Sequence, residues 1–333
     1  MKVAVVILNW NTKDYLKRFL PGLLASCRKF HTEERDAHVV VADNASTDGS
    51  LEMLKQKFPR VKTISLDRNY GFTGGYNRAL ARIKADYYVL INSDVKVSED
   101  WLSPLAGWMQ KNPDCGVCGP KLHALVDNRR TPRFEYAGAA GGYVDLFGYP
   151  FCRGRILSRT EPDYGQYDKA ADVLWVSGAC MMVRSSLWRK LGGFDERFFA
   201  HMEEIDFCWR AQSAGWKVNV VPQSIVWHLG GGTLPSSSPF KLELNFRNNL
   251  LMLAGNLPDS LGSRMIFATR YALDWLSAAA YALTGRFRYA AAVFKAHAGY
   301  RRLRKGRPAF AGKDVPGHRK TCILIRRRYE DSH

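Results

Sequence analysis

The 333-residue sequence has little of what marks several classes of protein. Its 7 cysteines are few, odd in number and scattered, which favours reduced thiols over a disulfide framework. With 14 prolines and 28 glycines against 46% hydrophobic residues, the chain is neither collagen-like nor disordered. Long apolar runs are missing too, because residues 3–8 are too few for a signal peptide and Arg270 and Asp274 interrupt residues 265–284. We therefore expect a cytoplasmic protein.

Acidic residues are outnumbered, at 31 Asp+Glu against 49 Lys+Arg, which gives a net charge of +18. Such an excess favours phosphate-rich partners or anionic membrane surfaces. Residues 284–333 hold 14 basic and 3 acidic residues, so this segment carries +11 and the rest of the chain only +7. A nucleic-acid-binding protein is one alternative, but no helix-turn-helix, zinc or RNP motif accompanies the charge, and we expect no nucleic-acid partner.

The N-terminal third alternates apolar strands with amphipathic helices. Residues 3–8 form a β-branched run without polar alternation, which is typical of a strand buried on both faces of a parallel sheet. The alternation predicts strands at residues 3–8, 39–42, 61–66 and 87–91 and helices at residues 12–27, 51–58 and 76–83. Right-handed crossovers between such elements predict an α/β fold with a parallel, doubly wound sheet over residues 1–95.

Beyond residue 95 the pattern is less regular. It predicts helices at residues 101–112 and 203–214, strands at 116–121, 173–183, 217–221 and 225–228, and a loop-rich stretch at 127–172. After residue 240 the chain is predicted to be helical.

Polar residues follow each strand of the predicted parallel sheet. They are Asn9 and Asn11, then Asp43 and Asn44, then Asn69, Gly74 and Asn77, and finally Asn92, Ser93 and Asp94. Because the carboxyl ends of parallel strands share one edge of the sheet, we expect these residues to converge on a ligand site, although turn chemistry alone also favours Asn, Asp and Gly. The first turn has no glycine and no Walker A lysine is present, which excludes the common NAD-type and P-loop sites.

Several of these residues suit a nucleotide bound with a metal ion. Asp43 and Asn44 can bind a base or ribose, and Asp94 can ligate a hard cation shared with a diphosphate. His228 ends a strand before three glycines and is a candidate second ligand for Mg²⁺ or Mn²⁺. The structural alternatives are a helix cap for Asp94 and a core histidine for His228.

Three acids begin the predicted helix at residues 203–214. Glu203 and Asp206 share one face, where Arg210 can pair with Asp206, while Glu204 points about 100° away. All three could simply stabilise the positive end of the helix. A carboxylate that faces its own direction is also what general-base catalysis requires, so Glu204 is the candidate base.

Taken together, these motifs resemble family 2 inverting glycosyltransferases, and within them the bacterial rhamnosyltransferase-type enzymes of surface polysaccharide assembly. The matching segments are VVILNWN at 5–11, VADNASTDGS at 41–50, NYGFTGGYN at 69–77, LINSD at 90–94, GGFDERFF at 192–199, EEID at 203–206 and VWH at 226–228. The resemblance implies a GT-A fold with a Rossmann-like, mostly parallel sheet flanked by helices. It implies a nucleotide-binding half at 1–95, an acceptor and catalytic half at 96–255, and a helical C-terminal extension at 256–333.

The resemblance also implies an activity. A dTDP-, UDP- or GDP-linked donor would transfer rhamnose or another hexose, with inversion, to a hydroxyl of a glycan or lipid-linked acceptor. Asp43 would bind the nucleoside, Asp94 and His228 a divalent cation, and Glu204 the acceptor proton. Asn92 replaces the first acid of the DxD motif, and Glu204 replaces the commoner Asp. A sugar-1-phosphate nucleotidyltransferase is the enzymatic alternative, but it normally has a glycine-rich basic loop after the first strand.

The C-terminal segments point to further contacts. Arg247, Asn248 and Asn249 lie where similar enzymes carry an arginine-asparagine pair near the diphosphate, although a solvent salt bridge of Arg247 is equally compatible with the sequence. Residues 286–307 mix aromatic residues with eight basic ones, which predicts a basic amphipathic helix on an anionic membrane. We therefore expect peripheral association with the inner face of the cell membrane; a solvated tail and an oligomer interface are the alternatives.

Overall fold

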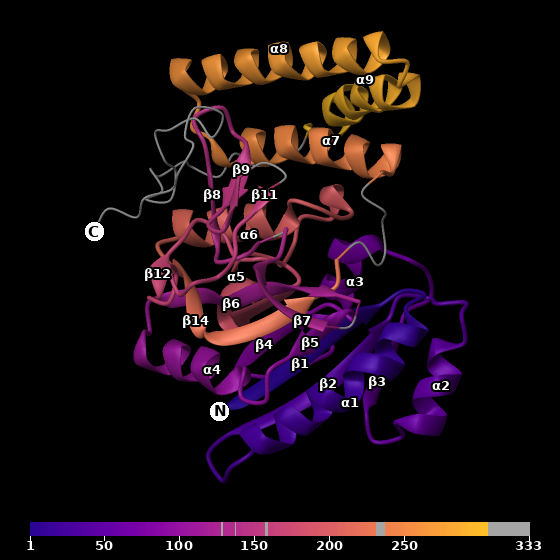
Figure 1. Cartoon of the computed structure of the whole chain (residues 1–333), viewed down its shortest axis with the longest axis vertical. Helices are drawn as coiled ribbons and strands as arrows, with labels where there is room; N and C mark the ends of the chain where they lie inside the picture. The colour runs from indigo at the N-terminus through magenta and orange to yellow at the C-terminus, as the bar shows by residue number, and fades with distance from the viewer. Residues whose placement is uncertain (128, 137, 157–158, 231–236, 306–333) are drawn as a thin grey trace.

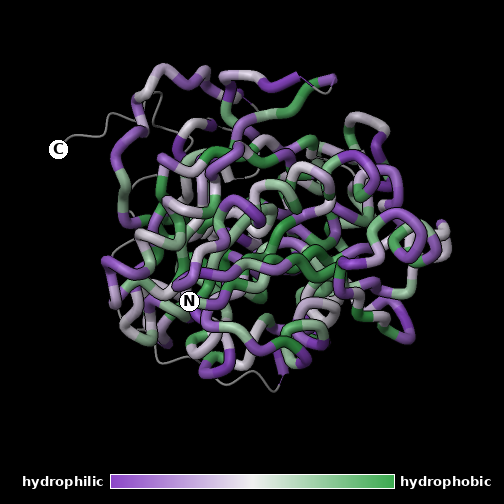
Figure 2. The backbone as a smooth tube through the Cα atoms, turned by 90° about the horizontal axis from the view of Figure 1, so that it is seen from below, coloured by the Kyte–Doolittle hydropathy of each residue, from purple (hydrophilic) through white to green (hydrophobic). Residues whose placement is uncertain are grey.

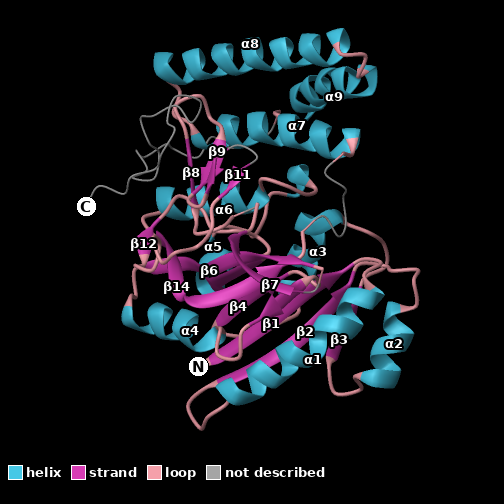
Figure 3. Cartoon of the chain, viewed as in Figure 1, coloured by secondary structure: helices cyan, strands magenta, loops and turns pink. Residues whose placement is uncertain are grey.

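The structure is a computed structural model that describes residues 1–127, 129–136, 138–156, 159–230 and 237–305. A twisted central sheet fills the lower half of Figure 1, helices cover its faces, and further helices are stacked at the upper end. Figure 3 shows that strands and helices mix around the sheet, whereas the upper end is helical. In Figure 2 hydrophobic stretches run through the middle of the molecule, where the sheet lies.

The first seven elements form the parallel half of the central sheet. They are β1 (Lys2–Asn9), α1 (Lys13–Phe30), β2 (Asp36–Asp43), α2 (Ser50–Lys57), β3 (Lys62–Ser65), α3 (Gly71–Leu80) and β4 (Tyr87–Ile91). The strands are parallel in the order β4-β1-β2-β3, which confirms the predicted sheet over residues 1–95. The helix α3 begins five residues earlier than predicted, because glycines with low helix propensity hide its first turn.

The second half of the chain extends this sheet with strands of both directions. Its elements include β5 (Val95–Val97), α4 (Leu102–Lys111), β6 (Cys115–Val126), β13 (Cys180–Arg184), α5 (Ser185–Lys190), the 3₁₀ turn η1 (Glu196–Phe198), α6 (Glu203–Ser213) and β14 (Lys217–His228). The main strand order is β12-β14-β6-β13-β4-β1-β2-β3. The two short strands predicted at residues 217–221 and 225–228 are one strand, β14, whose register shifts between Val221 and Ile225 around Pro222.

The segment predicted to be loop-rich, residues 127–172, also contains short strands that the sequence analysis did not predict. The segment contains β7 (Arg129–Phe134), β8 (Gly142–Val144), β9 (Pro150–Cys152), β10 (Arg155–Ile156), β11 (Arg159–Thr160) and β12 (Ala171–Asp172). Strands β8 to β11 form a second, antiparallel sheet. Strands of two to six residues are too short to show a periodic pattern. Residues 128, 137, 157 and 158 lie outside the described part, and the strand predicted at 173–183 is limited to β13.

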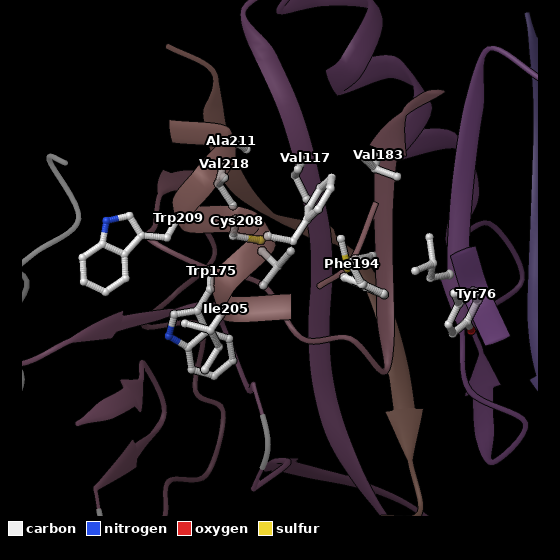
Figure 4. Packing of buried hydrophobic residues seen from close by; sticks show 14 of the residues in the cluster. Tyr76, Val117, Trp175, Val183, Phe194, Ile205, Cys208, Trp209, Ala211 and Val218 are labelled. Carbon is white, nitrogen blue, oxygen red and sulfur yellow. The ribbon is translucent and has the colours of Figure 1, made fainter. Parts of the chain in front are cut away.

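The central sheet carries one apolar core on each face. Leu16 of α1 and Leu105 of α4 belong to the first core, and Tyr76 of α3 and Phe207 of α6 to the second. Figure 4 shows side chains of α6, such as Cys208, turned toward the strands. Burying a large apolar side chain contributes roughly 1.5–3 kcal/mol. This packing fixes α6, which carries the three acids, relative to the sheet.

The upper end of the molecule consists of α7 (Pro239–Asn256), α8 (Leu261–Leu283) and α9 (Phe287–Leu303). The side chains of Ser238 and Ser260 accept backbone N–H groups and cap α7 and α8. In Figure 1 α9 lies between the other two helices and contacts both. No described helix has both the length and the apolar character to cross a membrane. The division at residue 255 stays a prediction, and residues 306–333 of the predicted extension lie outside the described part.

Candidate active site

Asp43 and Asn9 lie side by side where β2 and β1 end. Asn9 Nδ2 donates to Asp43 Oδ1 at 2.7 Å and to Ser46 Oγ at 2.9 Å, and Ser46 N–H donates to Asp43 Oδ2 at 2.9 Å. Nearby, Asn11 Oδ1 accepts Thr47 N–H at 2.7 Å. Asp43 has no exposed surface, so these bonds replace the water that a carboxylate would otherwise bind. The orientation of Asp43 is therefore set by the fold.

A second amide network joins the ends of β2 and β3. Asn44 Nδ2 donates to Asn69 Oδ1 at 2.9 Å and to Gly71 O at 3.0 Å, and Asn44 Oδ1 accepts Tyr70 N–H at 3.0 Å. A Cβ on Gly74 would lie 3.0 Å from Tyr70 Cβ, so only glycine fits there without a shift. These predicted donor-binding residues shape the same loops at the sheet edge.

Asn77 has a different role from the predicted one. The sequence predicts donor binding, but Asn77 Nδ2 donates to Phe194 O at 2.8 Å and Asn77 Oδ1 accepts Phe194 N–H at 2.9 Å. A Cβ on Gly193 would lie 2.4 Å from Asn77 Oδ1. Both ends of the amide are thus used to hold the turn at residues 192–195 against α3.

Asp94 and His228 meet next to the paired strands β5 and β14. His228 Nε2 lies 3.2 Å from Asp94 Oδ1, and both side chains are buried. Burial by itself would raise the pKa of Asp94, but the charge and hydrogen bond of His228 lower it below its usual range. Burial would lower the pKa of His228, but Asp94 and Glu135 outweigh it and raise that pKa to about 10. Asn92 and Ser93 lie in the adjoining turn, where Asn92 N–H donates to Ala179 O at 3.0 Å.

Glu135, which sequence reasoning missed, is the second acid beside His228. Its Oε1 lies 3.5 Å from His228 Nδ1, and its backbone N–H donates to Leu122 O at 2.9 Å. The side chain is buried just after β7. Glu135 is the one acid between Asp127 and Asp145 in a basic and apolar stretch, and this contrast was the available signal. The imidazole of His228 therefore lies between two carboxylates.

The donor chemistry of Asp94 and His228 fits a divalent cation. A carboxylate oxygen and a neutral imidazole nitrogen are ligands that Mn²⁺ accepts, and Mg²⁺ sites often use one or two carboxylates with substrate phosphates. Because the pKa of His228 is raised to about 10, a cation that binds its Nε2 would have to displace a proton. Across the described residues, no three His, Cys, Asp or Glu side chains are grouped so that they could hold a metal ion. A cation held by Asp94 and His228 would therefore need oxygen ligands from a bound diphosphate, and Glu135 would orient the imidazole through Nδ1.

Glu204 lies in the first turn of α6 beside Gly178. A Cβ on Gly178 would lie in ordinary van der Waals contact with Glu204, at 3.5 Å from its Cβ, so the two residues are direct neighbours. Glu204 Oε2 is buried and has no hydrogen-bond partner among the described residues. Burial raises the pKa of Glu204 from 4.5 to about 7, although backbone hydrogen bonds, including one from Gly178, oppose the shift. A carboxyl group with a free oxygen and a pKa near neutrality can accept a proton from a substrate hydroxyl.

Glu203 and Asp206 face the protein interior. Asp206 accepts Arg210 Nε at 2.8 Å, which confirms the predicted pair, and Asn256 Nδ2 at 2.7 Å. Burial, and then the neighbouring charge of Glu204, raise the pKa of Glu203 well above its usual range. Asp206 therefore anchors α6, whereas Glu203 Oε2 is buried without a hydrogen-bond partner among the described residues.

The backbone just before α6 is strained. The non-glycine residues with positive φ there are Phe199, His201 and Met202, at 64°, 69° and 72°. Such conformations cost roughly 1–3 kcal/mol each and persist only when neighbours hold them. Asn248 Nδ2 of α7 lies 2.9, 2.7 and 2.7 Å from the carbonyl oxygens of residues 198, 200 and 201. Asn248, which the resemblance placed with Arg247 near the diphosphate, thus holds the segment that aims Glu204.

Arg247 belongs to the same anchor. Its Nη2 donates to Phe198 O at 2.8 Å and to Arg197 O at 3.3 Å. A Cβ on Gly299 of α9 would lie 3.0 Å from Arg247 Cδ, so the side chain packs under α9. These contacts go to backbone carbonyl groups and not to a carboxylate, as a solvent salt bridge would have, so Arg247 holds residues 197–198, while its role at a diphosphate stays a prediction.

The topology brings the remaining candidates to one edge of the central sheet. Asp43 and Asp94 follow β2 and β4, which flank β1, and neighbouring strands are about 4.8 Å apart, so these strands are about 10 Å apart. Strand β13 runs antiparallel to β4, which places Gly178 and the adjacent Glu204 at this edge. Pairing of β14 with β5 adds His228.

Comparison with known proteins identifies similar sequences. The sequence model of "Glycosyl transferase family 2" matches residues 4–191, more than half of the chain. An N-acetylglucosaminyl-diphospho-decaprenol L-rhamnosyltransferase of Mycobacterium tuberculosis is 28% identical over 247 residues, which cover 68% of this chain and 75% of that protein.

Two solved structures have a similar fold. GalNAc-T7 with UDP, GalNAc and Mn²⁺ has a TM-score of 0.59 at 17% identity, and the match covers 78% of this chain but only 48% of that one. The mannosyltransferase PcManGT of Pyrobaculum calidifontis in complex with GDP-Man and Mn²⁺ has a TM-score of 0.55 at 15% identity, with 90% and 86% covered. At these identities the likeness concerns the fold.

Proposed function

The chain belongs to glycosyl transferase family 2, and from this membership we propose that it transfers a hexose or deoxyhexose from a nucleoside diphosphate donor to a hydroxyl of a glycan or lipid-linked acceptor. The expected family and the GT-A fold are confirmed. The observation that carries the proposal is the gathering of Asp43, Asp94, His228 and Glu204 at one edge of the sheet. The relative in M. tuberculosis is named for rhamnosyl transfer to a decaprenol-linked sugar, which supports rhamnose and a lipid-linked acceptor in cell-surface polysaccharide synthesis.

Donor binding rests on groups that the fold has already oriented. Asn9 and Ser46 hold the carboxylate of Asp43 in one orientation. The binding of a ribose or base would therefore cost little conformational entropy at this side chain. Asn44 and Asn69 hold the neighbouring loop. This arrangement recognises the nucleoside through side chains, in keeping with the absence of a glycine-rich phosphate loop.

The diphosphate is expected at Asp94 and His228. A divalent cation bound there would stabilise the charge that develops on the leaving diphosphate. Asp94 supplies a carboxylate oxygen and His228 Nε2 an imidazole nitrogen, while Glu135 faces Nδ1 and sets the direction of the ring. Both solved proteins of this fold contain Mn²⁺, which supports a cation of this kind.

Glu204 is the proposed general base. Its carboxylate takes the proton of the acceptor hydroxyl as that oxygen bonds to C1 of the sugar and the bond from C1 to the diphosphate oxygen breaks. A single displacement of this kind inverts the configuration at C1. The general base typically contributes 10²–10⁴-fold to the rate. The unpaired Oε2 and the pKa of about 7 suit this role at neutral pH.

The experiment that tests this function is a panel of dTDP-, UDP- and GDP-sugars, assayed for donor hydrolysis and for transfer to polyprenyl-diphosphate-linked sugars. We expect turnover with one donor, loss of turnover with EDTA, and recovery with Mn²⁺ or Mg²⁺. A nucleotidyltransferase would instead release pyrophosphate from a nucleoside triphosphate and a sugar 1-phosphate. That outcome, or no thermal stabilisation by any nucleoside diphosphate with Mn²⁺, would refute the proposal.

A lipid-linked acceptor would be met at a membrane surface. We therefore also propose that the protein works as a peripheral protein on the cytoplasmic side, as the basic C-terminal segment suggests.

A further inference from the structure

The helix α8 has its charged side chains on the inside and apolar side chains on the outside. Arg270 and Asp274 are 3% and 0% exposed, whereas Met265, Leu276 and Leu283 are 63%, 65% and 89% exposed. A surface helix of a soluble domain shows the opposite pattern. Figure 1 shows α8 as the outermost helix of the upper stack, with α9 and α7 beneath it.

Buried polar contacts fix this orientation of α8. Arg270 Nη2 donates to Asp274 Oδ1 at 2.8 Å, and His297 Nε2 of α9 lies 3.0 Å from Asp274 Oδ2. The guanidinium of Arg270 also stacks on the ring of Tyr149 at 3.8 Å. Turning the helix about its axis would break the contact of Arg270 with Tyr149 and that of Asp274 with His297, and would leave the buried His297 without this partner. The apolar surface is therefore a stable feature of the fold.

The outer face of α8 is continuous and uncharged. Its exposed residues are Met265, Ala268, Ala272, Trp275, Leu276, Ala279, Ala280 and Leu283. Phe294 of α9 extends it, with its ring 4.9 Å from that of Trp275, and Phe287 of α9 is 70% exposed. Apolar patches of this kind mark sites of interaction with proteins or membranes.

The exposed charges around this face are predominantly positive, and one exposed acid, Asp259 just before α8, pairs with Arg264. Exposed basic residues of the two helices and their connection are Arg264, Arg286, Arg288, Lys295, Arg301, Arg302, Arg304 and Lys305. Among residues 260–305 the single acid is the buried Asp274. A second copy of the chain packed here by two-fold symmetry would bring these cations against each other. An apolar face bordered by cations instead matches the headgroup region of an anionic bilayer.

We propose that the outer face of α8, with Phe287 and Phe294, inserts into the headgroup region of an anionic membrane while the basic residues bind lipid phosphates. This inference rests on the proposed function, because a lipid-linked acceptor is presented at such a surface. It also extends the sequence prediction, which based membrane contact on residues 286–307, by placing most of the apolar contact on α8. In the structure Val293 and Tyr300 of that segment are buried within the protein, and Arg307 lies outside the described residues.

The test is flotation of the full chain with vesicles of phosphatidylcholine, with and without phosphatidylglycerol. We expect binding that requires phosphatidylglycerol and weakens in high salt. The double variant Leu276→Glu, Leu283→Glu should lower the partition coefficient roughly tenfold or more, since it places charge in the apolar face. The matched control is Tyr164→Glu, at a side chain 86% exposed outside the helical stack, which should bind as the unaltered protein does.

Two results would overturn the proposal. One is binding by the double variant equal to that of the unaltered protein, or no binding by the unaltered protein. The other is a dimer in sedimentation equilibrium that the double variant abolishes, since the face would then join two copies. Donor hydrolysis measured on the same preparations, without vesicles, separates the two ideas: its absence would refute the proposed transferase while leaving vesicle binding interpretable.

Discussion

Replacing Glu204 by glutamine should remove activity and at the same time stabilise the protein. Glutamine keeps a carbonyl oxygen for the backbone N–H groups around Glu204 but cannot accept a proton. The loss of general-base catalysis predicts a kcat lower by 10²–10⁴-fold. The Michaelis constant for the donor should change little, because Asp43 and Asp94 are untouched.

The gain in stability follows from the pKa of Glu204. Because burial raises this pKa from 4.5 to about 7, the folded protein must either protonate the carboxyl or keep a charge away from water. The native state holds the proton more tightly than the unfolded chain does, so stability falls as pH rises from 4.5 to 7 and then stays level. At about 1.4 kcal/mol per pKa unit, the full penalty is about 3 kcal/mol. Glutamine removes this penalty.

Urea unfolding at pH 4.5 and at pH 8 measures this effect. The free energies of unfolding of the two proteins should agree at pH 4.5, and the variant should be more stable by about 3 kcal/mol at pH 8. In the unaltered enzyme kcat should also fall about tenfold per pH unit below pH 7, because the base becomes protonated. Equal stability at both pH values would show that Glu204 is not held in a desolvating site, and near-normal turnover would remove it from the role of base.

Three further predictions concern residues around Glu204 and His228. Asn248→Ala should lower the free energy of unfolding by about 2–3 kcal/mol, because the strained segment loses its anchor. It should also lower kcat by roughly tenfold or more, with little change in the Michaelis constant for the sugar donor. An unchanged kcat would contradict this prediction. Glu135→Gln should weaken Mn²⁺ binding roughly 10–100-fold in electron paramagnetic resonance titrations with a nucleoside diphosphate, and unaltered affinity would separate Glu135 from the cation. Gly71→Ala should lower the free energy of unfolding, measured with urea, by at least about 2 kcal/mol. The reason is that the alanine Cβ would lie 2.4 Å from the Phe199 ring, at a backbone φ of 70°. A free energy of unfolding equal to that of the unaltered protein would show that this loop adapts.

Much of the candidate site could be predicted from the sequence, because parallel strands obey a simple rule. Their carboxyl ends meet at one edge, so the acids and amides after β1, β2 and β4 had to lie together once the alternation of strands and helices was clear. The helical period alone separated Glu204 from Asp206 and paired Asp206 with Arg210. These conclusions depend on the spacing of residues that are close together in the chain, and a single sequence is enough to show that spacing.

Long-range contacts were beyond the same reasoning. Glu135 reaches His228, and Asn248 reaches the carbonyl groups before α6, across separations that no periodic pattern spans. Asn77 and Arg247 have polar groups that could bind the nucleotide-sugar donor. In the folded chain these groups form hydrogen bonds with backbone atoms of neighbouring elements. The small sheet of β8 to β11 escaped notice because its strands are too short for a period.

The C-terminal helices show most clearly which features the sequence determines and which depend on the tertiary structure. The sequence by itself determined that residues 265–283 are apolar apart from a narrow polar stripe, and that basic residues surround them. Which side of α8 faces outward was decided by the tertiary structure, in which Asp274 contacts His297 of α9 and Arg270 stacks on Tyr149 on the inner side of the helix. Composition therefore fixed what the chain can bury, and the pairing of buried polar groups fixed what it leaves exposed.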